Sequence, residues 1–174
     1  MDMRLKIIVF LSVLFGFSQT VFATDVVKSS VPGASIVGRG ILTYLVWDVY
    51  EATLYAPNGR WESQKPFALS IEYYRALQGA DIAKRSVQEM RRQGFTDEAK
   101  LADWYTRMKA IFPNVAAGTV LTAVFTPVGE TAFYNGNTPV GVIQGGDFAR
   151  LFFGIWLDEK TSEPELRRAL LGLS

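Results

Sequence analysis

The sequence predicts an α+β protein in which one large antiparallel sheet carries a layer of helices on one face. Strand patterns fill the first half of the chain, two helical patterns follow, and further strand patterns precede two more helices. Strands and helices grouped in this way, without strict βαβ alternation, are typical of an antiparallel sheet with helices segregated to one side. The length and the absence of repeats, linkers or low-complexity tracts indicate a single domain.

The first 23 residues have the composition of a secretory signal peptide. Two basic residues precede an apolar run from Ile7 to Phe17, and small side chains at Val21 and Ala23 suit cleavage after Ala23. The run is too short to span a bilayer, and no later apolar segment is long enough either. We therefore expect a signal peptide over residues 1–23, a mature domain over residues 24–174 and a periplasmic location; a retained N-terminal anchor is the alternative.

Charge and composition exclude several function classes. Removing Arg4, Lys6 and Asp2 with the leader from 18 basic and 17 acidic residues leaves 16 of each, unlike the positive footprint of a nucleic-acid binder. The chain has no cysteine and no histidine, which excludes disulfides, thiol nucleophiles and Ser-His-Asp triads and removes the commonest zinc ligands. Any acid–base chemistry must use carboxylates, lysine, tyrosine or water, and no cofactor or metal is indicated.

The N-terminal part of the mature chain has strand patterns. Asp25–Val31 is expected to be a short amphipathic strand that ends at the Pro32-Gly33 turn. Gly38–Pro57 is almost wholly β-branched, aromatic and aliphatic, and exceeds the usual strand length of about 5–6 residues. Its apolar pattern changes at Trp47, so we interpret it as one long bent strand or as two strands joined at a bulge. Asn58-Gly59 then predicts a tight turn.

A strand and two helices follow. Residues 67–74 alternate in the period of a half-buried strand. Asp81 is expected to cap a helix that ends at Gly94. The Thr96-Asp97-Glu98 segment is expected to cap a second helix, which Pro113 stops. The two helices form a hairpin inserted between β segments.

The last part of the chain returns to strands and then to helices. The predicted strands are residues 119–126, 131–134 and 139–143. An aromatic-rich helix over Phe148–Leu157 follows a Gly-Gly-Asp start, and its rings are expected to form a wall of an apolar cleft between sheet and helices. A capping box at Ser162 opens the final helix, Glu165–Leu171.

Two groups of residues are candidates for binding a polar head group. Arg39 stands between two glycines, and such small neighbours let a ligand approach the guanidinium and the backbone; a solvated turn arginine is the alternative. Tyr73, Tyr74 and Arg75 combine phenols with a guanidinium at a strand end, a set that binds carboxylates or enolates; a core tyrosine beside a surface arginine is the alternative. The acidic residues are scattered, so no catalytic residue is assigned.

Four segments of the chain match a known pattern. They are VYEATLYAP (Val49–Pro57), YYRALQGADIAKRSVQEMRRQG (Tyr73–Gly94), FYNGNTPVGVI (Phe133–Ile143) and FARLFFGIWLDEKTSEPELRRALLG (Phe148–Gly172). Together they resemble the bacterial chalcone isomerase-like family of exported proteins, and the last segment is the most specific. The resemblance covers nearly all of the mature chain. It implies the open-faced β-sandwich of chalcone isomerase, with a ligand cleft between a large antiparallel sheet and its helices.

The resemblance implies less about activity. The plant isomerase cyclises a chalcone to a flavanone with an arginine, a strand threonine, a tyrosine, an asparagine and a later hydroxyl. Arg39 is the only counterpart of that arginine, and the other positions fall near Leu45, Gln78, Arg85 and Gly154. Most of the polar site is thus missing. Non-catalytic relatives bind fatty acids with an arginine and a tyrosine in an apolar cleft, which makes Arg85 a further candidate.

We therefore expect a periplasmic, non-enzymatic protein that binds a fatty acid or another hydrophobic or amphipathic small molecule. The candidate head-group residues are Arg39, Tyr73, Tyr74, Arg75 and Arg85. One alternative is an intramolecular lyase or isomerase of unknown substrate, in which Arg39 stabilises an enolate or phenolate and a tyrosine shuttles the proton. The other is an envelope interaction factor with a filled cleft and an exposed apolar patch, for which the sequence names no protein partner.

Overall fold

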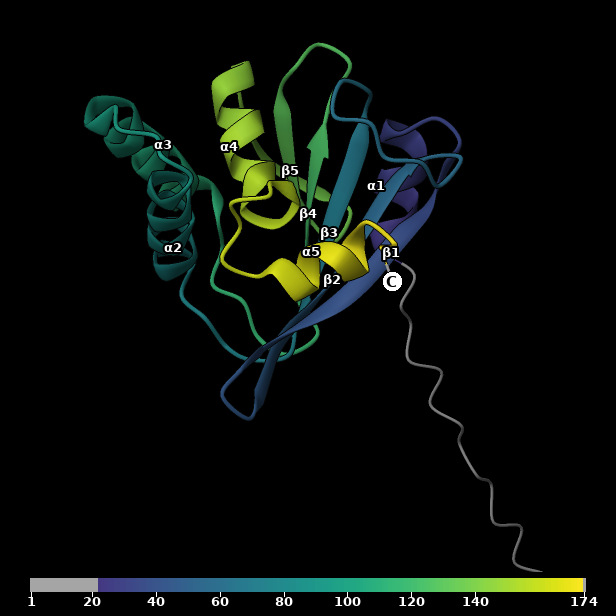
Figure 1. Cartoon of the computed structure of the whole chain (residues 1–174), viewed down its shortest axis with the longest axis horizontal. Coiled ribbons are helices and arrows are strands. Elements are labelled where there is room, and N and C mark those ends of the chain that lie inside the picture. Colours follow the sequence, from purple (N-terminus) through teal and green to yellow (C-terminus); the bar gives the residue numbers. More distant parts are fainter. Residues whose placement is uncertain (1–21, 174) are drawn as a thin grey trace, which may run out of the picture.

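A single antiparallel sheet organises the computed structural model, which describes residues 22–173 (Figure 1). Its strands are β1 (Ala34–Tyr44), β2 (Trp47–Pro57), β3 (Phe67–Tyr73), β4 (Val120–Phe125), β5 (Thr131–Asn135) and β6 (Thr138–Ile143). The helices are α1 (Phe22–Ser30), α2 (Gly79–Arg92), α3 (Glu98–Ile111), α4 (Gly146–Leu157) and α5 (Pro164–Leu170). The strands pair antiparallel in chain order from β1 to β6. The predicted α+β class, with a large antiparallel sheet and a helical layer on one face, is confirmed.

The main core lies between the sheet and helices α2 to α5. The strand register places Leu54, Leu69, Ala123 and Phe133 in one row across β2 to β5. Because side chains alternate between the two faces of a strand, this row and its neighbours two residues away face the helices. Phe152 of α4 packs on the row, with its ring 5.1 Å from that of Phe133 in an edge-to-face arrangement. The aromatic side chains of α4 are therefore part of the core, and two of them, Phe152 and Trp156, also line the cavity described below.

The predicted strand over Asp25–Val31 is wrong, because the chain forms helix α1 there. Three valines are buried on one side of this segment, whereas Asp25 and Lys28 are exposed. The valines pack on small side chains of the sheet face opposite to α2–α5, in a cluster of Val26, Val27, Val31, Ala68, Val124 and Ala132. Valine favours strands, and so short a segment does not separate a period of two from one of 3.6.

Gly38–Pro57 is neither one bent strand nor two strands joined end to end at a bulge. It belongs to a hairpin in which β1 and β2 pair from Ala34 and Pro57 to Tyr44 and Trp47. The turn consists of Leu45 and Val46, and Leu45 has a φ of 57°. Two-residue turns are usually marked by glycine, asparagine or aspartate. The change of pattern at Trp47 therefore located the boundary, but nothing in the residues indicated a turn.

The remaining elements lie close to their predicted bounds. Asp97 caps α3 as predicted, since its Oδ1 accepts a hydrogen bond from the Lys100 amide at 3.0 Å. The predicted cap at Asp81 is wrong: α2 begins at Gly79, whose amide donates to Asn114 Oδ1 at 3.0 Å. The first amide of α2 is thus satisfied by the segment that follows α3.

The predicted signal peptide, residues 1–23, lies outside the described residues except for Phe22 and Ala23, which are in α1. Export to the periplasm therefore stays a prediction. Within residues 22–173, none of the helices combines the length and the apolar character that a membrane crossing requires.

Candidate functional site

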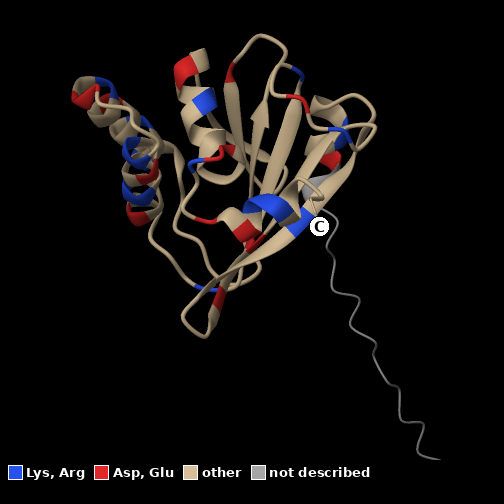
Figure 2. Cartoon of the chain, viewed as in Figure 1, with Lys and Arg blue, Asp and Glu red and all other residues tan. Residues whose placement is uncertain are grey.

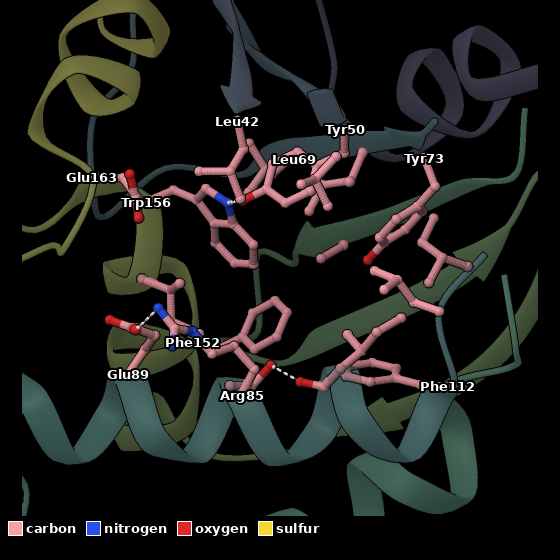
Figure 3. Close-up of a pocket in the computed structure, with 18 of the residues that line it drawn as sticks. Leu42, Tyr50, Leu69, Tyr73, Arg85, Glu89, Phe112, Phe152, Trp156 and Glu163 are labelled. Carbon is pink, nitrogen blue, oxygen red and sulfur yellow. Dashed lines mark hydrogen bonds and ion pairs between the residues drawn. The ribbon is translucent and has the colours of Figure 1, made fainter. Parts of the chain in front are cut away.

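A cavity of about 330 Å³ lies between the core face of the sheet and helices α2 and α4 (Figure 3). Its walls are mainly apolar. They include Leu42, Val49, Leu69, Ile71, Leu77, Ile82, Phe112, Leu121, Ala123, Phe133, Phe152, Ile155 and Trp156. Pockets that bind small molecules usually measure about 300–1,000 Å³ and combine apolar walls with a few polar groups. The cavity has the size and the lining of a small-ligand site.

Two phenols reach the cavity from neighbouring strands. Tyr50 of β2 and Tyr73 of β3 are cross-strand partners, with ring centroids 5.9 Å apart in an edge-to-face arrangement. Trp156 Nε1 donates a hydrogen bond of 2.9 Å to the Tyr50 hydroxyl oxygen, which leaves the Tyr50 proton free to be donated. Figure 3 shows the Tyr73 hydroxyl directed into the cavity, and among residues 22–173 it has no hydrogen-bond partner.

Both phenols are suited to donate hydrogen bonds to a ligand rather than to act as bases. Burial raises the pKa of Tyr50; the hydrogen bond from Trp156 lowers it by less, and the charge of Glu163 raises it further. Burial also raises the pKa of Tyr73, with a smaller contribution from Tyr50. At neutral pH each hydroxyl therefore keeps its proton, and the pair presents two donors to an oxygen acceptor inside an apolar cavity.

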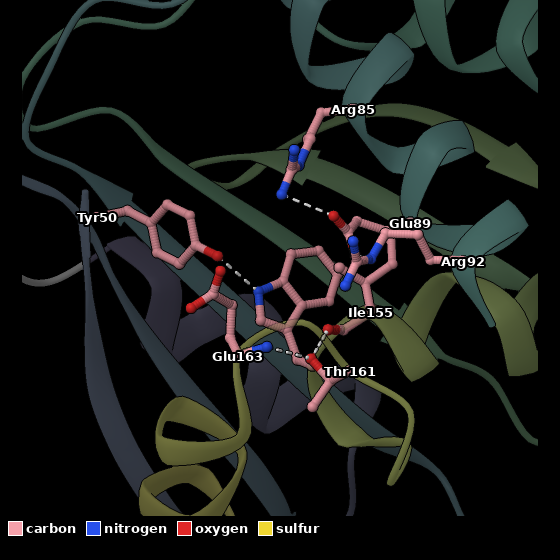
Figure 4. A network of polar contacts seen from close by, with 8 residues as sticks. Tyr50, Arg85, Glu89, Arg92, Ile155, Thr161 and Glu163 are labelled. Atoms are coloured by element: carbon pink, nitrogen blue, oxygen red, sulfur yellow. Dashed lines mark hydrogen bonds and ion pairs between the residues drawn. The ribbon is translucent and has the colours of Figure 1, made fainter. Parts of the chain in front are cut away.

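An ion-pair group borders the cavity along α2 (Figure 4). The Glu89 side chain is only 4% exposed, and its Oε1 lies 2.7 Å from Arg85 Nη2 while its Oε2 lies 3.5 Å from Arg92 Nε. The three residues are three and four positions apart, so one helix face brings them together. Two arginines thus compensate one buried carboxylate. The contact between Arg85 and Glu89 is an ion pair without an aligned hydrogen bond, since Glu89 Oε1 accepts no hydrogen bond from the described residues.

Acidic side chains outnumber basic ones in the cavity lining. Asp81 and Glu163 line it together with Glu89, against the single guanidinium of Arg85. Thr161 fixes the segment that carries Glu163, since its Oγ1 donates to Ile155 O at 2.6 Å and accepts from the Glu163 amide at 3.1 Å (Figure 4). The cavity therefore does not attract anions strongly. Among residues 22–173 no three acidic side chains gather in a way that would hold a metal ion.

Of the five predicted head-group residues, Tyr73 and Arg85 line the cavity. Arg39 does not, because its register partner is Thr53 on the opposite face of the sheet. There Arg39 Nη1 lies 3.7 Å from Glu51 Oε1, and the arginine side chain is 56% exposed.

The two glycines beside Arg39 serve the packing of α5. A Cβ atom at Gly38 would lie 2.1 Å from the Ala169 carbonyl oxygen, and one at Gly40 would lie 2.8 Å from Leu166 Cδ1. Helix α5 therefore rests directly on the backbone of β1. The glycines leave room for this helix rather than for a ligand beside Arg39.

Tyr74 and Arg75 also lie away from the cavity. Tyr74 follows Tyr73 in the chain and so points to the opposite face of the sheet, where it is 37% exposed. The guanidinium of Arg75 lies over the ring of Trp47, 4.9 Å from its centroid. The structure thus separates the Tyr73-Tyr74-Arg75 group that the sequence placed together.

Tyr50 and Glu89 were not among the predicted site residues, although the sequence carried a signal for both. Tyr50 has the same strand parity as the buried Ala52 and Leu54, which places it on the core face. Glu89 falls three residues after Ser86, within the buried stripe of α2, where a carboxylate needs charged partners.

Comparisons with known proteins show the family and the fold. Residues 26–172 match the family model described as chalcone isomerase-like. A Haemophilus influenzae protein of uncharacterised function is 25% identical over 137 residues, which cover 78% of this chain and 67% of that protein. The crystal structure of the Arabidopsis thaliana fatty-acid binding protein AtFAP1 has the same fold, with a TM-score of 0.63 and 12% identity over 80% of this chain and 87% of that one. The family model covers nearly all described residues, and the chain therefore belongs to the chalcone isomerase-like family.

Proposed function

We propose that this protein binds a fatty acid or a similar amphipathic molecule, with the apolar chain of the ligand in the cavity between sheet and helices. The observation that carries the proposal is the cavity of about 330 Å³ with apolar walls and two phenol donors. Its likeness in fold to a plant fatty-acid binding protein supports the same class of ligand.

The polar groups favour an uncharged head group. Tyr50 and Tyr73 can donate hydrogen bonds to an oxygen acceptor, whereas the carboxylates of Asp81 and Glu163 repel a negatively charged head group. Arg85 gives little attraction of its own, because Glu89 already pairs with it at 2.7 Å. A fatty acid thus binds best in its protonated form, and an ester or alcohol of the same chain length binds without any dependence on protonation.

The test uses protein expressed with its own N-terminal segment, analysed by native mass spectrometry and lipid extraction. We expect a stoichiometric amphipath that extraction removes and that added dodecanoic acid or its methyl ester replaces. The acid is expected to bind more tightly at about pH 5 than at about pH 8, because pH 5 is closer to the ordinary carboxyl pKa and more of the acid is protonated there. The ester is expected to bind equally at both values.

A matched pair of variants tests the location of the ligand. Ala123→Leu fills part of the cavity and is expected to abolish binding, whereas Ala132→Leu makes the same change on the opposite face and is expected to bind normally. Circular dichroism checks that both fold. A folded wild-type protein that carries no amphipath and takes up neither the acid nor the ester contradicts the proposal.

We also propose that the protein works in the periplasm. The support is the basic, then apolar, then small-residue order of residues 1–23. Cell fractionation with intact-mass measurement is expected to find a periplasmic form that begins at Thr24. A cytoplasmic form that keeps Met1 contradicts this part.

A further inference from the structure

The turn of the β1–β2 hairpin exposes four consecutive apolar side chains. The exposed fractions of Tyr44, Leu45, Val46 and Trp47 are 70%, 81%, 81% and 57%. Figure 1 shows this hairpin projecting beyond the helices, and its tip carries no charged residue in Figure 2. Single exposed apolar residues are ordinary on protein surfaces, but four together at a projecting tip indicate an interaction site.

Local folding preferences do not explain these residues. Leu45 has a φ of 57°, a left-handed conformation that is unfavourable for a side chain with a Cβ. A glycine or asparagine at this turn would relieve the strain and make the tip more soluble. The chain places large apolar groups here against both preferences. Strain and exposure that coincide at one site point to a function for that site.

The hairpin is graded in polarity along its length. The apex, Leu45 and Val46, is aliphatic, and the next cross-strand pair, Tyr44 and Trp47, is aromatic. Below them lies a polar layer in which Thr43 Oγ1 donates to Asp48 Oδ1 at 2.7 Å and Arg75 stacks on Trp47. A bilayer surface has the same order, since aliphatic groups enter the hydrocarbon, tyrosine and tryptophan favour the headgroup level, and charges stay in water.

We propose that the tip, residues 44–47, inserts into a lipid bilayer and docks the protein on the membrane surface. The hairpin also links the tip to the cavity, because Leu42 and Val49 line the cavity. Each lies two residues from the tip, about 7 Å along its strand. Docking therefore brings the cavity next to the acyl chains, so that an amphipath transfers between bilayer and cavity with little exposure to water. This transfer role rests on the proposed function, whereas docking itself does not.

Vesicle flotation tests the docking. The full chain is used as recovered from the cell, with one N-terminus shared by all variants, and the vesicles contain phosphatidylethanolamine and phosphatidylglycerol. The double variant Leu45→Glu/Val46→Glu is expected to lower the vesicle-bound fraction about tenfold or more, because charged groups are strongly disfavoured in hydrocarbon. Val128→Glu is the matched control. Val128 is 77% exposed in the β4–β5 turn, at the other end of the sheet, and its substitution is expected to leave binding unchanged.

Fluorescence quenching shows which part of the protein enters the bilayer. Brominated acyl chains are expected to quench Trp47 in the wild type, and Trp47→Phe is expected to lose this quenching. Trp104 and Trp156 are inside the fold, each 7% exposed, and the partly buried Trp61 lies between β2 and β3, at the end of the sheet away from the tip. Neither readout involves a fatty acid, so the docking proposal can fail while the proposed ligand binding stands.

Three results would overturn the proposal. The first is a double variant that binds vesicles as well as the wild type does. The second is quenching that persists in Trp47→Phe, and the third is a wild type that does not bind vesicles. In the third case, sedimentation that shows a self-associating wild type and a monomeric double variant would reassign the tip as an interface between two copies of the chain.

Discussion

Tyr50 and Tyr73 lie side by side on adjacent strands, but their hydroxyls have different partners. The Tyr50 oxygen accepts a hydrogen bond from Trp156, whereas the Tyr73 hydroxyl is available to a ligand. Replacing either tyrosine by phenylalanine removes one hydroxyl group, and this loss therefore has different consequences at the two positions. At Tyr50 it removes a protein contact together with a proposed ligand contact, and at Tyr73 it removes the proposed ligand contact alone.

Phenylalanine substitutions separate these two roles. Tyr73→Phe is expected to weaken binding of methyl dodecanoate by up to about tenfold, the net value of one hydrogen bond, with an unchanged free energy of unfolding. Tyr50→Phe leaves the Trp156 indole N–H without its partner and is expected to lower the free energy of unfolding by about 1–3 kcal/mol. Ligand titration and urea denaturation of both variants measure the two effects. Equal losses of stability would show that Tyr73 also has a structural role.

At the scale of the element, the contact between α5 and β1 depends on the absence of side chains at two positions. Helix α5 has seven residues, too few to be stable alone in water. Its buried Leu166 and Leu170 hold it on the sheet, and Gly38 lets the Ala169 and Leu170 carbonyls approach the strand. The stability of this element therefore comes from its close contact with β1.

Alanine at Gly38 tests this contact. A Cβ there would lie 2.1 Å from the Ala169 carbonyl oxygen, a backbone atom that moves only with the helix. Gly38→Ala is expected to lower the free energy of unfolding by about 1–3 kcal/mol through overpacking. Gly146→Ala in the first turn of α4 meets no atom within 4 Å and is expected to be neutral or slightly stabilising. Urea denaturation compares the two, and equal effects would mean that α5 adjusts freely.

Elements with a clear period or cap could be predicted from the sequence. The alternation in residues 67–74 gave β3, and the cap at Asp97 gave α3. Helix α1 and the Leu45–Val46 turn could not be predicted, because α1 is determined by tertiary contacts and the turn residues run against local preference. The face of the sheet on which Arg39 lies could not be predicted either. Both parities of the stretch around it are apolar, so only the pairing with β2 decides which residues face the cavity.

At the scale of the whole molecule, the sheet separates two environments. One face and the helices enclose the apolar core and the cavity, whereas α1 covers only part of the other face. Family membership and the order of the elements after α1 were accessible from the sequence. The cavity itself was not, because its volume depends on how helices α2 and α4 sit above the strands.

Burial of the two phenols makes the stability of the whole molecule sensitive to alkaline pH. The pKa of Tyr73 is raised by burial in the folded state, whereas in the unfolded chain it is close to the ordinary value of about 10. Below that value both states are protonated and folding is unaffected. As pH rises above it, the unfolded state loses the proton while the folded state retains it, so the free energy of unfolding falls. Each such tyrosine contributes a slope of about 1.4 kcal/mol per pH unit.

Urea denaturation between about pH 8 and pH 11 spans the ordinary tyrosine pKa and measures this slope. The wild type is expected to lose stability steadily above about pH 10, and Tyr73→Phe is expected to reduce the slope by the share of one tyrosine. Tyr134→Phe is the control, because Tyr134 lies on the opposite face and is only partly buried. A slope that is unchanged in Tyr73→Phe would mean that the cavity admits enough water to ionise this phenol in the folded protein. The cavity would then be wet, and its apolar walls would not exclude solvent from a bound ligand.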